Sequence, residues 1–262
     1  LTLISSGGFL PFNDISLILN TDFKKLIFST LMLISFFSIF FIYNLVLFKN
    51  RDKNFFYEDY NLLLYVITLV LVFLLFFGYN NEFINILFSI FSSISNIGIS
   101  LNNEFNNLHF IFLLLVIIGG SFFSTSSGLR FIKIYSLIKF SFNQILSFSK
   151  PRNIFMNRLL FSKKNFEVKE INKYFLSIII FIVSLFILTS LVSFSGIDFE
   201  KCLKISILTL MNTVNSSAYG INDFDFQNIH FFTKYSLILF MIVGRIELLT
   251  ILLIIKKYLF KN

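Results

Sequence analysis

Three short segments combine small residues with hydroxyl or amide side chains, and each follows an apolar run: SSGG (5–8), SNIG (95–98) and NSSA (215–218). Small residues let an extended backbone present its carbonyl oxygens to a cavity. A short helix that ends just before such a segment directs the negative end of its dipole to the same place. Oxygen ligands in a negative field suit a desolvated monovalent cation. One such segment alone could be an ordinary loop, but three in the same position favour an ion-binding filter. Its predicted residues are Ser5, Ser6, Gly7, Gly8, Ser95, Asn96, Ile97, Gly98, Asn215, Ser216, Ser217 and Ala218.

A longer polar stretch, GGSFFSTSSG at 119–128, interrupts an apolar run and is followed by Arg130 and Lys133. Irregular backbone at membrane depth is tolerated only where protein or a water-filled path satisfies its polar groups, so we expect this break to line such a path. Arg245 lies deep in another apolar run, where a charge is costly and marks a functional candidate. Glu247 lies two residues away and points to a different side of a helix, so the two are not expected to neutralise each other. The alternative for Arg245 is a structural pairing with another helix.

The elements that must position these residues are membrane helices. The chain of 262 residues is 56% hydrophobic, contains 40 phenylalanines and has a mean hydropathy of +0.82. That composition exceeds what a soluble domain of this length can bury, and it predicts an all-α polytopic membrane protein.

The apolar runs have two lengths. Runs long enough to cross the hydrocarbon core, about 20 residues, lie near 26–48, 61–77, 175–194 and 231–255. Shorter runs, predicted to be re-entrant or broken helices, lie at 83–94, 108–118 and 202–214. The segment 131–148 continues past the glycine break, so 108–118 and 131–148 could be two halves of one crossing.

These elements recur in one order: a crossing, a short apolar helix, a polar turn and a second crossing. We predict the end of one unit at 1–60, a second unit at 61–150, a cytoplasmic loop at 151–170 and a third unit at 171–262. The segment before the first turn shows no charged region of a signal peptide, so we expect Leu1 to be the cut edge of a longer protein.

Basic residues cluster in loops and at the chain end, whereas the connections 100–108 and 220–228 carry Asp, Glu and Asn. The positive-inside rule places the basic segments in the cytoplasm. They could serve topology alone or also dock a cytoplasmic partner. The net charge of +8 lies on loop ends beside lipid, so no nucleic-acid partner is expected.

The order of elements, together with ISSGGFLPFNDIS, GGSFFSTSSGLRFIK and GRIELLTILLI (244–254), resembles the TrkH/KtrB/HKT superfamily of potassium transporters. The resemblance covers nearly the whole chain and begins at what would be the second filter segment. It implies a potassium-channel-like fold of repeated helix, pore helix, filter and helix units around a central pore. It also implies potassium uptake across the inner membrane of a bacterium, through a gated pore that is either channel-like or a symporter.

Carried over by position, the resemblance places filter glycines at Gly7 and Gly98 and an alanine, Ala218, where the family has glycine. Alanine resists the positive φ that glycine adopts, which leaves sodium open as a substrate. The resemblance also places Arg245 beside the break, where it would donate to carbonyls or hydroxyls of residues 121–127. The implied gate comprises Gly119, Gly120, Ser121, Phe122, Phe123, Ser124, Thr125, Ser126, Ser127, Gly128 and Arg245. Family members have smaller residues at the two phenylalanine positions, so a tight constriction is expected there.

The resemblance further implies a homodimer that works with a cytoplasmic, nucleotide-binding regulatory subunit of the TrkA/KtrA type. The alternative function is a non-conducting membrane scaffold or assembly subunit that retains the fold, which the alanine at position 218 motivates.

The sequence contains no motif that supports an enzymatic function. The chain lacks a Gly-x-Ser-x-Gly elbow, a His-Glu-x-x-His motif, a P-loop and a dinucleotide-binding fingerprint. Cys202, His109 and His230 are too few and too scattered for a disulfide framework or a metal site. We therefore expect no enzyme activity, no cofactor and no metal beyond the transported potassium.

Overall fold

The computed structural model describes residues 3–8, 18–47, 56–78, 83–101, 108–149, 168–214, 216–221 and 229–246, together with Lys257. Its helices are α1 (Asp22–Phe36), α2 (Ile39–Val46), α3 (Tyr57–Phe77), α4 (Phe83–Ile94), α5 (His109–Ile117), α6 (Phe131–Ser149), α7 (Val168–Ser193), α8 (Phe199–Leu210) and α9 (Phe231–Ile246). A 3-10 turn, η3, spans Ser217–Tyr219, and two short strands are β1 (Ile118–Gly119) and β2 (Leu129–Arg130). The basic loop 151–167, Asn215 and Glu247 lie outside the described residues.

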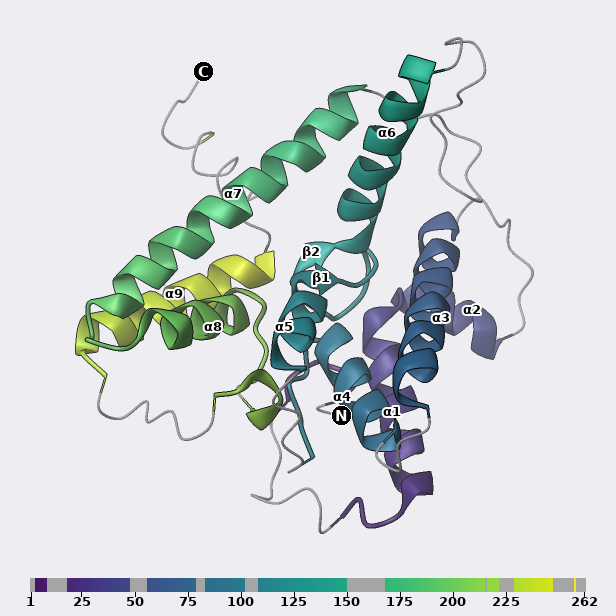
Figure 1. The fold of residues 1–262 in the computed structure, drawn as a ribbon, viewed down its shortest axis with the longest axis horizontal. Coiled ribbons are helices and arrows are strands. Elements are labelled where there is room, and N and C mark those ends of the chain that lie inside the picture. Colours follow the sequence, from purple (N-terminus) through teal and green to yellow (C-terminus); the bar gives the residue numbers. More distant parts are fainter. Residues whose placement is uncertain are drawn as a thin grey trace.

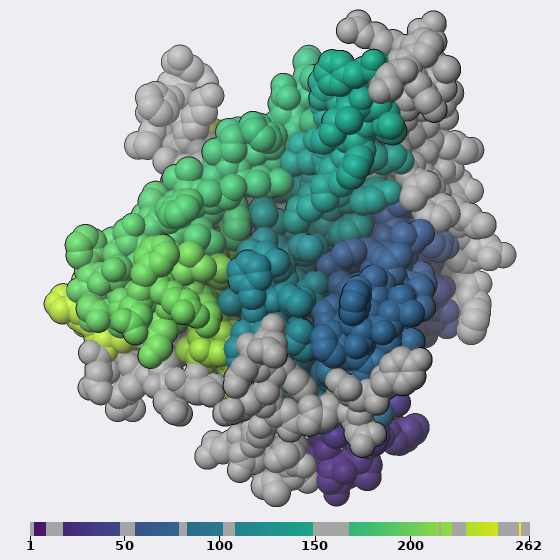
Figure 2. All heavy atoms as spheres, viewed as in Figure 1, coloured from purple at the N-terminus to yellow at the C-terminus, as the bar shows by residue number. Residues whose placement is uncertain are grey.

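The outward face of α7 is apolar, and its buried face mixes apolar and hydroxyl side chains. Its hydroxyl side chains Ser177, Ser184 and Thr189 are buried against the rest of the chain. Its large apolar side chains point outward, namely Phe175, Leu176, Ile179, Ile182, Val183, Phe186 and Ile187. A surface stripe of this kind is costly in water and suited to lipid. Figure 2 shows α7 and α6 forming much of one outer face of the molecule.

Two described helices are long and apolar enough to cross a membrane: α3, with a mean hydropathy of 2.5, and α7, with 2.9. Only 28% and 33% of these windows are buried inside the chain, so most of each faces outward. A buried core helix of a soluble protein would have its apolar side chains covered. The length, apolar composition and outward exposure of α3 and α7 are features of a membrane protein.

Two of the short helices, α4 and α5, occupy the middle of the molecule (Figure 1). Figure 1 shows α4 and α5 at the centre, with α1 and α3 on one side and α7, α8 and α9 on the other. α4 packs against α1 and α5, and α8 packs against α7 and α9. α4 is buried over nearly its whole length, including its serines, so its apolar character serves protein packing and not lipid contact.

Three features differ from the sequence expectations. The run 26–48 is two helices, because the chain becomes extended at Phe37 and Ser38 between α1 and α2. The chain is not wholly helical, since β1 and β2 pair in parallel at the base of the 119–128 break. The short helix expected at 202–214 ends at Leu210, so the turn that follows it begins at Met211.

Candidate functional site

Three turns in the structure share one backbone geometry. Ser6, Asn96 and Asn212 are the non-glycine residues with positive φ in the described part of the chain, at 51°, 58° and 52°. Each donates its backbone N–H to the carbonyl three residues earlier, at 3.4, 3.2 and 3.1 Å respectively. Positive φ is uncommon outside glycine, and asparagine tolerates it better than most residues. We call these segments the first turn (3–8), the second turn (95–98) and the third turn (211–214).

The second and third turns are helix C-terminal caps of the same type. Ile97 N donates to Ser92 O at 3.0 Å, and Thr213 N donates to Leu208 O at 2.9 Å. With the i to i−3 bonds above, these form the Schellman arrangement, in which one residue in the left-handed region closes a helix. The caps leave the C-terminal ends of α4 and α8 directed at the turns, and a helix C-terminus carries a partial negative charge.

The three turns meet through Gly8, Gly98 and Val214. Val214 N donates to Ile97 O at 3.4 Å, which joins the third turn to the second. A Cβ on Gly8 would contact Ile97 O and would lie 2.6 Å from Val214 Cγ2. A Cβ on Gly98 would contact Val214 O and would lie 2.7 Å from Val214 N. Both glycines also have positive φ, 66° and 80°, so each is required by conformation and by close approach.

This arrangement corrects the expected position of the third turn. Counting from the positive-φ residue, Val214 occupies the place of Gly8 and Gly98, and it belongs to the segment 211–214 and not to 215–218. Ser217 and Ala218 form η3, which packs against α5. The Ala218 carbonyl is 2.7 Å from His109 Nδ1, and the Ser217 hydroxyl is 2.8 Å from that of Ser100. Neither residue lines the cavity described next.

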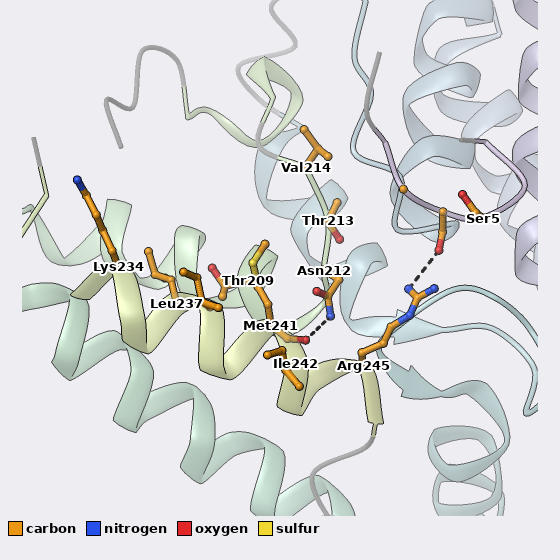
Figure 3. Close-up of a pocket in the computed structure, with 13 residues that line it drawn as sticks. Ser5, Thr209, Asn212, Thr213, Val214, Lys234, Leu237, Met241, Ile242 and Arg245 are labelled. Carbon is orange, nitrogen blue, oxygen red and sulfur yellow. Dashed lines mark hydrogen bonds between the residues drawn. The ribbon is translucent and has the colours of Figure 1, made fainter. Parts of the chain in front are cut away.

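A cavity of about 930 Å³ separates the first turn from α8 and α9. Its polar wall includes Ser5, Ser6, Gly7, Thr209, Asn212 and Thr213. Its other wall is a stripe of α9 that begins at Lys234 and ends at Arg245, with apolar residues between them. Figure 3 shows these two cations at opposite ends of the stripe, and Asn212 bonded to the Met241 carbonyl at 2.9 Å.

The 119–128 break is a compact loop, which we call the gate loop. β1 and β2 close its base, with Ile118 opposite Leu129 and Gly119 opposite Arg130. The Arg130 guanidinium donates from Nη1 to three oxygens inside the loop: Ser121 O at 3.0 Å, Ser124 Oγ at 3.2 Å and Ser126 O at 3.2 Å. Arg130 therefore braces the loop from within, a role that the sequence did not reveal.

The gate loop is bonded to the first turn and to α9. Ser6 Oγ donates to Thr125 O at 2.8 Å, and Thr125 Oγ1 donates to Ile4 O at 2.7 Å. Arg245 Nη1 donates to Ser127 Oγ at 2.8 Å and to Ser6 Oγ at 3.3 Å. The expected donation from Arg245 to a hydroxyl of the loop is thus present, and the same atom also reaches the first turn.

The positions of Phe122 and Phe123 differ from those of the tight constriction that we expected from the sequence. Their side chains are 52% and 55% exposed, and neither lines the cavity. The rings pack edge to face on each other, with centroids 5.2 Å apart, and Phe123 packs on Phe40 of α2 at 5.3 Å. The bulk of this pair covers the outside of the gate loop next to α2.

The site therefore includes residues that the sequence did not single out: Asn212, Thr213 and Val214 in the third turn, Glu58, which accepts the Phe122 N–H of the gate loop, and Asp59, which accepts the Ser38 N–H next to it. A signal for the first group was present, because an asparagine follows the apolar run in both SNIG and MNTV, as a left-handed cap requires. Near the N-terminal end of α8, Lys204 forms an ion pair with Glu200 at 2.6 Å, and this hydrogen bond and positive charge lower the pKa of the exposed Glu200 carboxyl.

Comparison with known proteins shows the fold. No protein-family model matches the chain, and no curated protein matches its sequence. Among solved structures, it is similar to the crystal structure of the potassium transporter TrkH from Vibrio parahaemolyticus, with a TM-score of 0.74 at 18% sequence identity. The match covers 97% of this chain and 56% of that protein, so the chain has a TrkH-like fold and spans little more than half of TrkH.

Proposed function

We propose that this chain is part of a subunit that carries potassium inward across the cytoplasmic membrane through a gated, channel-like pore. The observation that supports it most is the convergence of three turns of one geometry, within a fold similar to a potassium transporter. In this proposal the turns are filter segments, α4 and α8 are pore helices, and the units 1–60, 61–150 and 171–262 are repeats around the pore.

The turns are suited to replacing the water around a monovalent cation. Their residues include no carboxylate, so the ligands would be backbone carbonyls and hydroxyls. The C-terminal ends of α4 and α8 would add a negative field without a fixed charge, which lets an ion bind and still leave. Ser5, Ser6, Gly7 and Thr213 give one wall of the cavity polar groups that such an ion needs, opposite the mainly apolar stripe of α9.

In this proposal the gate loop and Arg245 control passage beyond the turns. The guanidinium lies at the end of the cavity and is held by hydroxyls from both the first turn and the gate loop. A fixed positive charge opposes a cation, so movement of the loop would change the barrier by moving the charge that it holds.

A second candidate, a non-conducting scaffold, is favoured by Val214. Its Cγ2 lies at the closest approach of the three turns, where the first two turns have glycine. Its β-branched side chain resists positive φ, so its carbonyl does not take the orientation that the glycines allow. The valine at position 214, where the other two turns have glycine, also keeps sodium as an alternative substrate. This reason replaces the one based on Ala218.

Assembly and location are further parts of the proposal. A homodimer and a cytoplasmic nucleotide-binding regulator follow from the sequence resemblance, and the basic loops at 48–55 and 151–167 would be the regulator's docking surface. The inner membrane of a bacterium is the corresponding location. We expect lipid as the only other partner and no enzymatic activity.

The proposal is tested by expressing the full-length natural protein in a strain that lacks its own potassium uptake and measuring growth at limiting potassium. We expect rescue, uptake of the potassium analogue rubidium, and loss of both when Gly98 is replaced by valine. Sodium uptake measured in parallel identifies the preferred ion. A folded, membrane-inserted protein that carries neither potassium nor sodium would overturn the transport proposal in favour of the scaffold.

A further inference from the structure

The helix α3 begins with two adjacent carboxylates, Glu58 and Asp59, the only charged residues in an otherwise apolar crossing. Asp59 is only 4% exposed. A buried carboxylate is costly unless it is hydrogen-bonded. The partners of this pair therefore indicate what the two acids stabilise.

Each carboxylate accepts a backbone N–H from a different irregular segment. Ser38 N, in the interruption between α1 and α2, donates to Asp59 Oδ1 at 2.9 Å. Phe122 N, in the gate loop, donates to Glu58 Oε1 at 2.9 Å. Neither N–H is part of a helix ladder. The Ser38 bond is buried, and a buried backbone donor without a partner costs on the order of 2–7 kcal/mol for transfer to an apolar medium, whereas the Phe122 bond is exposed.

The two irregular segments are also bonded directly to each other. Ser121 N donates to Phe36 O at 3.1 Å, Ser126 N donates to Ser35 O at 3.2 Å, and Ile39 N donates to Phe123 O at 3.3 Å. The helix interruption and the gate loop thus satisfy one another's backbone groups. Moving the loop alone would break these bonds together with the bond from Phe122 N to Glu58, while Asp59 would still hold the interruption at Ser38.

The charges around the gate loop match its backbone polarity. Arg130 donates to carbonyl oxygens of Ser121 and Ser126, whereas Glu58 accepts the N–H of Phe122. The loop is therefore held between a cation at its carbonyls and a carboxyl group at an amide. Hydrogen bonds from an ionised guanidinium are roughly twice as strong as those between neutral groups, so the charge of Arg130 contributes as well as its shape.

We propose that Glu58 and Asp59 are positioning residues that hold the gate loop against the interruption between α1 and α2, and that releasing them opens the loop. The proposal rests on the assignment of this loop as the gate in the proposed function. Its geometric part, that the two carboxylates hold the loop in place, can be measured without any transport.

The test places a reporter in the loop of the full-length protein. Ser121→Cys puts a thiol at a position that is only 1% exposed, in a Cys202→Ser background that removes the one cysteine of these 262 residues. The rate of modification by a membrane-impermeant thiol reagent is then measured with Glu58→Gln, with Asp59→Asn, and with Glu200→Gln as the matched control. Glu200 is a carboxylate with a 78% exposed side chain whose ion pair, with Lys204, lies within α8, so it is a matched site for the same chemical change.

We expect Glu58→Gln and Asp59→Asn each to raise the modification rate by roughly tenfold, the change that corresponds to weakening one hydrogen bond to a carboxyl group. The control should leave it unchanged, and basal rubidium uptake should rise in the first two variants alone. Glu58→Asp keeps the charge but shortens the side chain, and it should give an intermediate rate. It also serves as the test if the glutamine variant does not fold.

The outcomes separate the two proposals. Equal modification rates in the folded Glu58, Asp59 and Glu200 variants overturn the positioning role. Raised accessibility without flux of any ion leaves the positioning role standing and counts against the transport proposal. Raised accessibility with unchanged, measurable uptake overturns the link between this contact and gating.

Discussion

Replacing Gly98 by alanine tests whether the second and third turns meet as the structure has them. Gly98 has a φ of 80°, and an added Cβ would contact Val214 O and lie 2.7 Å from Val214 N and 2.8 Å from Thr213 Cγ2. Two of these three neighbours are backbone atoms of a capped turn, which cannot rotate away. The substitution therefore combines a conformational penalty with a displacement of the third turn.

A matched control separates the two effects. Gly196 has a φ of 74°, and nothing lies within 4 Å of an added Cβ there. Gly196→Ala should cost only the left-handed penalty, about 1–2 kcal/mol. Gly98→Ala should cost this penalty plus about 1–3 kcal/mol for overpacking, which the site relieves by separating the turns.

The assay is rubidium uptake by cells that produce equal amounts of each variant, with thermal unfolding of the purified proteins beside it. The extra 1–3 kcal/mol at Gly98 corresponds to a loss of uptake of about 5- to 150-fold relative to Gly196→Ala. Gly196→Ala should lower the unfolding temperature and retain uptake. Equal uptake in the two variants would refute the close contact between the turns, and loss of uptake in Gly196→Ala alone would place the ion path elsewhere.

Two further substitution pairs test the register of the third turn and the role of Arg245. Val214→Gly should raise uptake and shift the ion preference toward potassium, because it removes a side chain from the place where the three turns meet. Ala218→Gly should change neither uptake nor preference. The opposite result, in a comparison of rubidium and sodium fluxes, would support the third turn at 215–218 that the sequence predicts. Arg245→Lys keeps the charge but cannot bond Ser6 and Ser127 in the same geometry, so basal ion flux should rise severalfold. Lys234→Arg, at the other end of the α9 stripe, is the control. Unchanged flux in Arg245→Lys would assign the gating effect to the charge alone.

Helices whose ends coincide with a change in hydropathy could be predicted from the sequence. The short apolar run 83–94 is the helix α4, and the run 61–77 is the apolar body of α3. The end of α8 could not be found in this way, because Met211 and Val214 continue the apolar character beyond Leu210. The helix ends there because Asn212 adopts positive φ, a local backbone event that hydropathy does not record.

The interruption between α1 and α2 is the clearest limit of the sequence. No glycine or proline marks Phe37 and Ser38, the usual causes of a sharp break. The break is stabilised by partners far along the chain, since Asp59 accepts the Ser38 N–H and the gate loop supplies Phe123 O to Ile39 N. A tertiary contact of this kind does not depend on local helix propensity, so the local sequence gives no sign of it. For the same reason, the sequence shows Glu58 and Asp59 only as ordinary acidic residues in the first turn of a helix.

Arg245 connects the cavity, the first turn and the gate loop. A guanidinium at the end of the cavity must be satisfied by acceptors, and in the described residues it bonds two serine hydroxyls, Ser6 of the first turn and Ser127 of the gate loop. Hydroxyls neutralise no charge, so the cation keeps its field toward the cavity while its place is fixed. Because one nitrogen, Nη1, serves both hydroxyls, displacing the loop alters the support of the first turn through the same atom. In the proposed mechanism, the gate loop and the first turn are thus coupled by a shared donor, and weakening either bond should affect both.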